Sequence, residues 1–192
     1  DPLPPYVQPP KPSAPEGLGA LERLALSPES QMDRVFLLTP TLVVAYDCYP
    51  KAERHLLIMP RARIGGPADL RPEHAPLLRS MAQMGRAIAR AFRRDHPEMA
   101  PLRLGFHAAP SMRQLHLHAI SADLDSACLK SKKHWNSFTT DFFVRPATWT
   151  RMLERGGRVA LDRAAEEMKL KAPMACPYTG TLNLNLNAWT RG

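Results

Sequence analysis

The sequence predicts an α+β domain in which about five antiparallel strands are covered by one long helix. Short β-branched or apolar runs follow one another between Thr-Pro and Tyr-Pro turns, as in an antiparallel meander. A later stretch keeps one helical face apolar over several turns. The chain has 192 residues, 44% of them hydrophobic, which is enough for one good core with a small appendage.

The first elements can be justified in order along the chain. Residues 1–17 hold seven prolines in a polar background, which predicts a disordered lead-in. A short amphipathic helix is then predicted from apolar residues at helical spacing before Pro28, namely Leu18, Leu21, Leu24 and Ala25. Three strands of the meander are predicted at residues 35–38, 42–46 and 55–59.

The covering helix is predicted to begin between Pro72 and Pro76 and to end near Arg94. Its apolar face is formed by Leu78, Met81, Met84, Ile88 and Phe92. Two further strands are predicted at residues 102–107 and 115–120, so that residues 18–145 form the main domain.

The C-terminal segment, residues 146–192, is predicted to be a small helical region. Helices are expected at residues 148–154 and 162–170. The Leu-Asn alternation at residues 182–187 favours a strand or an irregular tail.

The strongest chemical signal is the alternation of polar groups in Gln114-Leu-His-Leu-His-Ala-Ile120. Gln114, His116 and His118 would share one face of a strand, because successive strand side chains point to opposite faces. Two imidazoles about 7 Å apart on that face could divide a phosphoryl transfer between them, since histidine titrates close to neutral pH.

Two other interpretations compete with catalysis. The histidines could be solvated or packed in the interior, or they could form half of a metal site. The preceding segment Gly105-Phe-His-Ala-Ala-Pro-Ser-Met112 favours catalysis. It adds His107 and a small-residue turn that could aim backbone N–H groups and the Ser111 hydroxyl at an anion.

Charge and cysteine content restrict the partners. The net charge of +8 and the pI near 9.8 suit a polyanion such as nucleic acid. Three cysteines far apart indicate no disulfide framework and favour a reducing compartment. No apolar run approaches the roughly 20 residues that a membrane span needs, and no signal-peptide pattern opens the chain. We therefore expect an intracellular protein with no membrane partner.

Three blocks of the sequence resemble one known family. Residues 104–123, followed by Ser126-Ala-Cys-Leu-Lys-Ser-Lys-Lys-His-Trp-Asn-Ser-Phe138, are similar to the histidine-triad domain of the aprataxin family, and residues 47–60 are similar to its nucleotide-binding strand pair. The resemblance covers residues 18–158 in the same order. It implies the histidine-triad fold and a hydrolase that removes AMP from 5′-adenylated DNA ends, as arise from abortive ligation.

The resemblance also implies roles for individual side chains. His116 would be the nucleophile that forms an adenylyl-histidine, and His118 would contact the phosphate. His107 and His55 would assist charge stabilisation and leaving-group protonation, although both could instead be hydrogen-bonded interior histidines.

The expected binding residues fall into two groups. The nucleotide and its phosphate would be bound by Asp47 at the ribose, by Ser111 and Lys133 at phosphate oxygens, and by Gln114. DNA would be bound by a lysine-rich loop through Lys130, Lys132 and Trp135. These lysines could also be a plain charged loop, and Trp135 could be a packing anchor, which we favour. No cofactor and no metal are expected, and we expect a nuclear protein that acts as a monomer on DNA.

The sequence departs from the family at two places. Gln114 stands where aprataxins have the first histidine of the triad, and glutamine cannot titrate near neutral pH. We therefore expect activity to be altered rather than abolished. The zinc finger that usually follows is degenerate, because Cys176 is not followed by histidines, and one thiolate cannot form a four-coordinate zinc site. No structural zinc is therefore predicted.

Two alternative functions remain open at this point. A small-molecule hydrolase of nucleoside phosphoramidates or dinucleotides is favoured if the lysine-rich loop faces away from the site. A DNA-end-binding protein with impaired catalysis is favoured if Gln114 disables the site.

Overall fold

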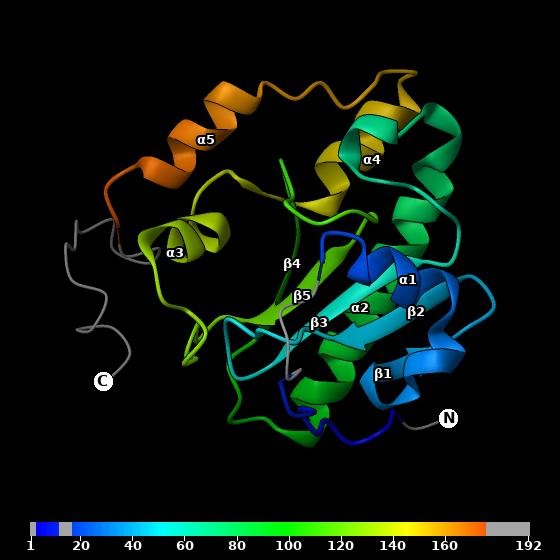
Figure 1. Ribbon diagram of the computed structural model, residues 1–192, viewed down its shortest axis with the longest axis vertical. Coiled ribbons are helices and arrows are strands. Elements are labelled where there is room, and N and C mark those ends of the chain that lie inside the picture. The colour runs from blue at the N-terminus through cyan, green and yellow to red at the C-terminus, as the bar shows by residue number, and fades with distance from the viewer. Residues whose placement is uncertain (1–2, 12–16, 176–192) are drawn as a thin grey trace.

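The computed structural model describes residues 3–11 and 17–175, and its centre is one antiparallel sheet (Figure 1). The strand order is β1-β2-β3-β5-β4-β6. The strands are β1 (Val35–Leu38), β2 (Leu42–Tyr46), β3 (His55–Pro60), β4 (Leu102–His107), β5 (Leu117–Ser121) and β6 (Phe143–Val144). The α+β prediction with a mainly antiparallel sheet is therefore confirmed, with one strand more than expected.

Helices surround this sheet. They are α1 (Ala20–Leu26), α2 (Ala75–Asp95), α3 (Lys132–Thr139), α4 (Pro146–Glu154) and α5 (Arg163–Lys171). Short 3₁₀ turns lie at η1 (Pro28–Arg34), η2 (Pro67–Asp69) and η3 (Pro72–His74). None of the described helices combines the length and the apolar content that crossing a bilayer requires.

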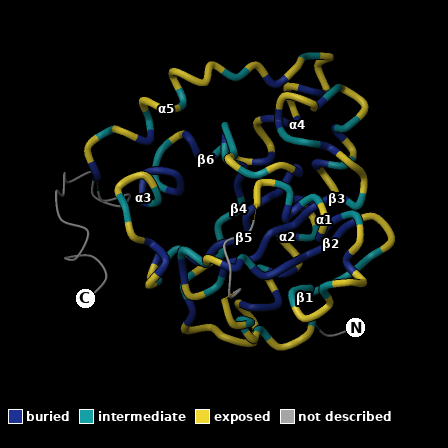
Figure 2. The backbone as a smooth tube through the Cα atoms, in the orientation of Figure 1, coloured by how far each residue is buried: buried dark blue, intermediate teal, exposed yellow. Residues whose placement is uncertain are grey.

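The two faces of the sheet serve different purposes. On β3, Leu56 and Ile58 pack into the core that also contains the apolar residues of α2. Leu57 and Met59 alternate with them and pack with residues of α1. Strands β2, β3 and β5 are buried along their whole length (Figure 2). Because His55 alternates in the same way, it lies on the α1 side of the sheet, opposite α2.

Helix α2 covers the sheet as the apolar periodicity predicts. Its buried residues include Leu78, Met81, Ile88 and Phe92. The absence of a side chain at Gly85 is needed for this packing, since a Cβ there would lie 2.7 Å from the Leu104 Cδ2 atom. The long helix therefore approaches the sheet closely and forms the main core with it.

The N-terminal segment differs from its prediction. Residues 3–11 contain no helix or strand, but Tyr6 packs edge-on against Tyr46 and Phe92, with ring centroids 5.2 and 5.9 Å away. The Tyr6 hydroxyl also accepts a 3.2 Å hydrogen bond from the backbone N–H of His55. These contacts attach the segment to the folded unit, so the expectation of a disordered lead-in does not hold for residues 3–11.

The C-terminal helices pack on the same unit. Trp149 of α4 stacks on Phe106 of β4 with ring centroids 4.9 Å apart, and Leu153 is buried in the main core. Helix α5 lies beside α3 (Figure 1). Helices α4 and α5 were predicted at residues 148–154 and 162–170, within two residues of their observed bounds. Cys176 and the alternation at residues 182–187 lie outside the described residues.

Candidate active site

A cavity of about 480 Å³ opens on the α1 side of the sheet. It is bounded by the ends of β3 and β5, the turn after β4, helix α3 and one side of α5. Seven of the residues predicted for the site line it: Asp47, His55, His107, Ser111, His116, His118 and Lys133. The fold therefore brings together residues from four separate parts of the sequence, as the resemblance implied.

His116 is held by one hydrogen bond at the entrance to β5. Its Nδ1 lies 2.8 Å from the backbone oxygen of Gln114. Because a carbonyl oxygen can only accept, Nδ1 must carry the proton, and Nε2 must carry the lone pair in the neutral ring. His116 lines the cavity and is 7% exposed. The tautomer thus leaves one basic nitrogen available to a bound molecule.

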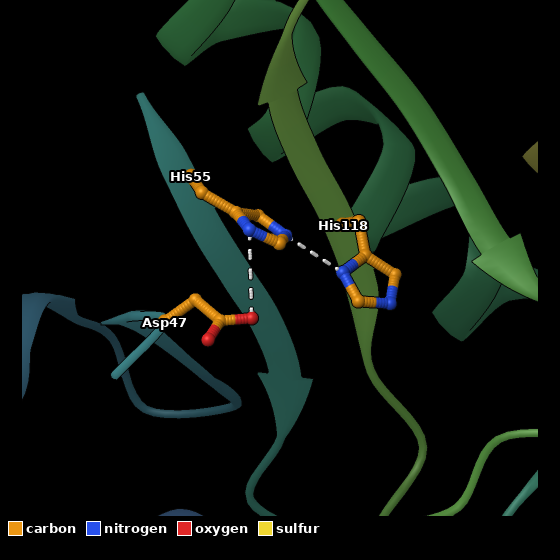
Figure 3. A group of neighbouring side chains, drawn as sticks. All are labelled: Asp47, His55 and His118. Atoms are coloured by element: carbon orange, nitrogen blue, oxygen red, sulfur yellow. Dashed lines mark hydrogen bonds and ion pairs between the residues drawn. The ribbon is translucent and has the colours of Figure 1, made fainter. Parts of the chain in front are cut away.

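His55 and His118 form a second fixed arrangement. The backbone N–H of Lys51 donates to His55 Nδ1 at 3.1 Å, so the proton of the neutral His55 ring is on Nε2. That Nε2 lies 2.9 Å from His118 Nδ1 (Figure 3). His118 Nδ1 must then accept, and its own proton is on Nε2. Among the described residues, this buried Nε2 has no hydrogen-bond partner.

His107 completes the group on β4. Its ring centroid is 4.2 Å from that of His118. It has a hydrogen bond to the backbone of Ser137, while its buried Nε2 has no partner in the described part of the chain. A backbone oxygen accepts from Nδ1, so Nε2 of His107 carries a lone pair. Among these three rings, His118 therefore offers an N–H donor, and His107 and His116 offer basic nitrogens.

All four histidines are kept neutral. Burial lowers the pKa of His55 from 6.5 to about 4, against the opposing effect of Asp47. Burial also lowers the pKa of His116, and it places those of His107 and His118 well below the ordinary value. Phe138 contributes to this dry environment, since its ring contacts His55 and His118 edge-on. The tautomers described above are therefore the forms present at pH 7.

Asp47 lies at the end of β2, next to His55. Its Oδ2 is 3.5 Å from His55 Nδ1 (Figure 3), and its Oδ1 accepts from the backbone N–H of Tyr49 at 2.8 Å. Burial raises its pKa, but His55, Lys51 and the Tyr49 N–H outweigh burial, so the net shift is downward. Asp47 is therefore an ionised acceptor at the edge of the cavity.

The group of Asp47, His55 and His118 could also ligate a metal, since one ligand atom of each lies within 4.8 Å of the others. Both ring nitrogens of His55 are already hydrogen-bonded, to Lys51 and to His118. A metal ion would have to displace at least one of these bonds. The observed contacts fit an arrangement that fixes protons better than they fit a set of metal ligands.

Four predicted site residues do not line the cavity, namely Gln114, Lys130, Lys132 and Trp135. The strand begins at Leu117 rather than at residue 115, and Gln114 has a left-handed backbone with φ of 82°. The buried Gln114 side chain bonds to the Pro60 and Ala62 carbonyls and does not line the cavity. The Gln114 side chain is thus bonded to the segment after β3, and its predicted role in binding the nucleotide stays a prediction.

The lysine-rich segment, predicted as a loop, is helical from Lys132 onward, and the Ser131 hydroxyl caps α3 by accepting from the His134 N–H. Lys130 and Lys132 do not line the cavity, and Lys132 Nζ donates to the Lys171 carbonyl at 2.9 Å. Trp135 is 5% exposed and its Nε1 donates to the Ala175 carbonyl. Trp135 is thus packed in the interior, as in the packing interpretation that we favoured, and its contact with DNA stays a prediction.

Sequence reasoning missed several residues that line the cavity. They are Lys51, His134, Phe138, Arg163 and Glu167. Lys51 and His134 lie inside the blocks that carry the resemblance, and this position could have identified them. Arg163 and Glu167 belong to α5, and no pattern in the sequence indicates that this helix returns to the cavity.

The antiparallel sheet, the covering helix and the strand histidines define a histidine-triad protein. Residues 24–134 match the family described as "Scavenger mRNA decapping enzyme C-term binding". The Aprataxin of Danio rerio is 44% identical over 140 residues, which cover 73% of this chain and 42% of that protein.

Two solved structures are also similar. "Crystal structure of aprataxin ortholog Hnt3 in complex with DNA" matches with a TM-score of 0.69 and 26% identity, covering 86% of each chain. "Hnt3 in complex with DNA and guanosine" matches with a TM-score of 0.66 and 26% identity, covering 85% of this chain and 86% of that one. The chain therefore belongs to the matched family and, within the histidine-triad superfamily, to the aprataxin group. It spans about two fifths of the length of the Aprataxins of Danio rerio and Gallus gallus.

Proposed function

We propose that this chain is a DNA-repair hydrolase that removes AMP from 5′-adenylated DNA ends. The observation that carries the proposal is the tautomer of His116, whose Nδ1–H is bound to the Gln114 carbonyl so that Nε2 is a nucleophile. The similarity to aprataxins and to DNA complexes of Hnt3 supports the choice of substrate.

In the first step, the His116 Nε2 lone pair forms a bond to the phosphorus of the adenylate. The bond from that phosphorus to the bridging oxygen breaks, and its electrons leave with the DNA 5′-phosphate. Phosphate monoesters have a second pKa of about 6, so this group can leave as a dianion at pH 7. A hydrogen bond from His118 Nε2–H to a phosphate oxygen is then sufficient, and no general acid is required.

In the second step, water attacks the adenylyl-histidine phosphorus and the P–N bond breaks. The electron pair of that bond returns to His116 Nε2, and AMP is released. His107 Nε2 carries the lone pair that would accept the water proton and pass it to solvent.

The remaining residues would position the substrate. His55 does not face the phosphate in this scheme, but orients His118 through the 2.9 Å hydrogen bond. Lys133 and Ser111 would bind phosphate oxygens from the cavity wall, and the Asp47 carboxylate would accept from the ribose hydroxyls. Action on DNA ends would place the protein in the nucleus.

The test is AMP release from a nicked duplex that carries a 5′-adenylate, with adenosine 5′-phosphoramidate as a small-molecule control. We expect AMP release from the DNA, and its loss in His116→Ala. A protein that cleaves only the phosphoramidate would contradict the proposed substrate.

A small-molecule nucleotide hydrolase is the second candidate. Lys130 and Lys132 lie outside the cavity lining, which is the arrangement that favours this alternative. The cavity volume of about 480 Å³ also falls within the about 300 to 1,000 Å³ typical of sites for single small ligands. A DNA-end-binding protein with impaired catalysis is less well supported, because Gln114 does not intrude into the cavity.

A further inference from the structure

Gln114 uses its whole side chain to connect the segment after β3 to the start of β5. Its Nε2 donates to the Pro60 carbonyl at 2.7 Å and to the Ala62 carbonyl at 2.9 Å. Its Oε1 accepts from the backbone N–H of Ile64 at 3.4 Å. The residue is completely buried. Both N–H donors and the oxygen of this amide group are therefore directed at residues 60–64.

The backbone of Gln114 acts at the same place. Its N–H donates to the Gly65 carbonyl at 3.0 Å, and the next N–H, of Leu115, donates to the Ile64 carbonyl at 2.7 Å. Its own carbonyl accepts from His116 Nδ1. The φ of 82° is costly for a residue with a side chain and persists only where the surroundings impose it. The side-chain bonds thus set the direction of the carbonyl that fixes His116.

We propose that Gln114 is a positioning residue that holds His116 in its Nδ1–H tautomer, and that its amide keeps this restraint independent of pH. The amide has two N–H donors at every pH, one for Pro60 and one for Ala62. A neutral imidazole has a single N–H, so a histidine at this position could satisfy both carbonyls only when protonated. The expected effect on turnover rests on the proposed function, whereas the effect on the His116 tautomer does not.

We call the hydrogen bonds that join the Gln114 side chain to residues 60–64 the clamp. The charged groups near the clamp determine how a histidine at position 114 would titrate. Arg61 and Arg63 belong to the clamped segment, and Arg113 is the preceding residue. Glu22 of α1 forms an ion pair with Arg63. Asp69 and His74 line a surface pocket together with Glu22, Arg63 and Arg113. With several guanidinium groups nearby and burial in the same direction, a histidine here would be mostly neutral at pH 7. It would then lack one of the two donors.

The experiment compares the unaltered chain with Gln114→His, and uses Gln83→His on the exposed face of α2 as the matched control. Imidazole ¹⁵N chemical shifts of His116 are recorded without substrate between pH 5 and 8, and kcat and KM for AMP release are measured over the same range. In Gln114→His we expect the Nδ1–H tautomer and kcat to be recovered as pH falls and lost as pH rises. The expected loss of kcat at pH 8 is about ten- to a hundred-fold, with little change in KM.

The two arms separate the inference from the proposed function. If the tautomer responds as described but no AMP is released by any variant, the clamp stands and the proposed substrate fails. If Gln114→His keeps the tautomer and the pH profile of the unaltered chain, or if Gln83→His changes them equally, the clamp is overturned. If Gln114→His does not fold, the tautomer in Gln114→Ala, which removes both donors, decides: an unchanged Nδ1–H tautomer overturns the inference, and a mixed one supports it.

Discussion

The position of one proton on each ring determines what each histidine in the cavity can do, because a neutral imidazole has one donor nitrogen and one acceptor nitrogen. His116 offers a lone pair at Nε2, and His118 offers a proton at its buried Nε2. One side chain is thus suited to form a bond to phosphorus and the other to stabilise charge. Replacing them should therefore have unequal effects.

We expect His116→Ala to abolish AMP release while leaving thermal stability nearly unchanged. His118→Ala should lower kcat by roughly a hundred- to a thousand-fold, the usual effect of losing one donor to a developing charge. Single-turnover assays on adenylated DNA measure both values. Near-normal turnover in His116→Ala would show that another group is the nucleophile.

His55 should make the folded state sensitive to acid. Its pKa is about 4 in the folded protein, against 6.5 for the ordinary side chain, so the unfolded chain takes up the proton first as pH falls. The free energy of unfolding is therefore highest, as far as His55 is concerned, above pH 6.5. It falls by about 3 kcal/mol as the pH drops from 6.5 to 4. Urea unfolding of His55→Gln should show a stability that falls less steeply over this range. His96→Gln, on an exposed residue, is the control and should keep the steep fall.

The lysines at the start of helix α3 and just before it lie in different environments. Lys133 lines the cavity, whereas Lys130 is exposed and Lys132 bonds to the end of α5. These different positions allow the substrate class to be tested within one short segment of the sequence. Residues that reach only a long polyanion should matter for DNA and not for a mononucleotide.

We expect Lys133→Ala to slow hydrolysis of adenylated DNA and of adenosine phosphoramidate alike. Lys130→Ala and Lys132→Ala should affect DNA alone. For each lysine that contacts a backbone phosphate, the slope of log affinity against log salt should decrease by about one. Unchanged salt slopes in both variants would favour the small-molecule hydrolase.

At the scale of the whole molecule, the N-terminal residues belong to the folded unit. The Tyr6 ring contacts Tyr46 of β2 and Phe92 of α2, and Arg54 lies over its face at 4.7 Å. The Tyr6 hydroxyl bonds to the N–H of His55, at the start of the strand that carries the site. This segment therefore links the main core to the strand that bears His55 at the cavity.

Tyr6→Ala should lower the free energy of unfolding by about 2 to 3 kcal/mol, because a partly buried ring is lost. Tyr6→Phe keeps the ring and should cost only about 1 kcal/mol for the lost hydrogen bonds. Chemical denaturation of both variants and of the unaltered chain measures these free energies of unfolding. Equal stabilities for the three proteins would mean that residues 3–11 contribute nothing to the fold.

The elements of this protein were largely predictable from local pattern. The strands at residues 35–38, 42–46 and 102–107 and the helix ending near Arg94 were placed correctly because alternation and helical periodicity are properties of neighbouring residues. The pairing of His116 with His118 followed from the same alternation. The group formed with His55 and His107 came from family resemblance, since no local pattern connects positions so far apart.

Only the tertiary structure decided where a side chain points when its hydrogen-bond partners are far away in the sequence. Gln114 appeared to point into the site, but the carbonyls of Pro60 and Ala62 turn it away. Trp135 is buried because Ala175 and the core around α3 cover it. Position 114 meets residues 60–64, and position 135 meets residue 175, only after the sheet and helices have packed. Residue order determined which elements form, and packing determined which polar groups face the cavity.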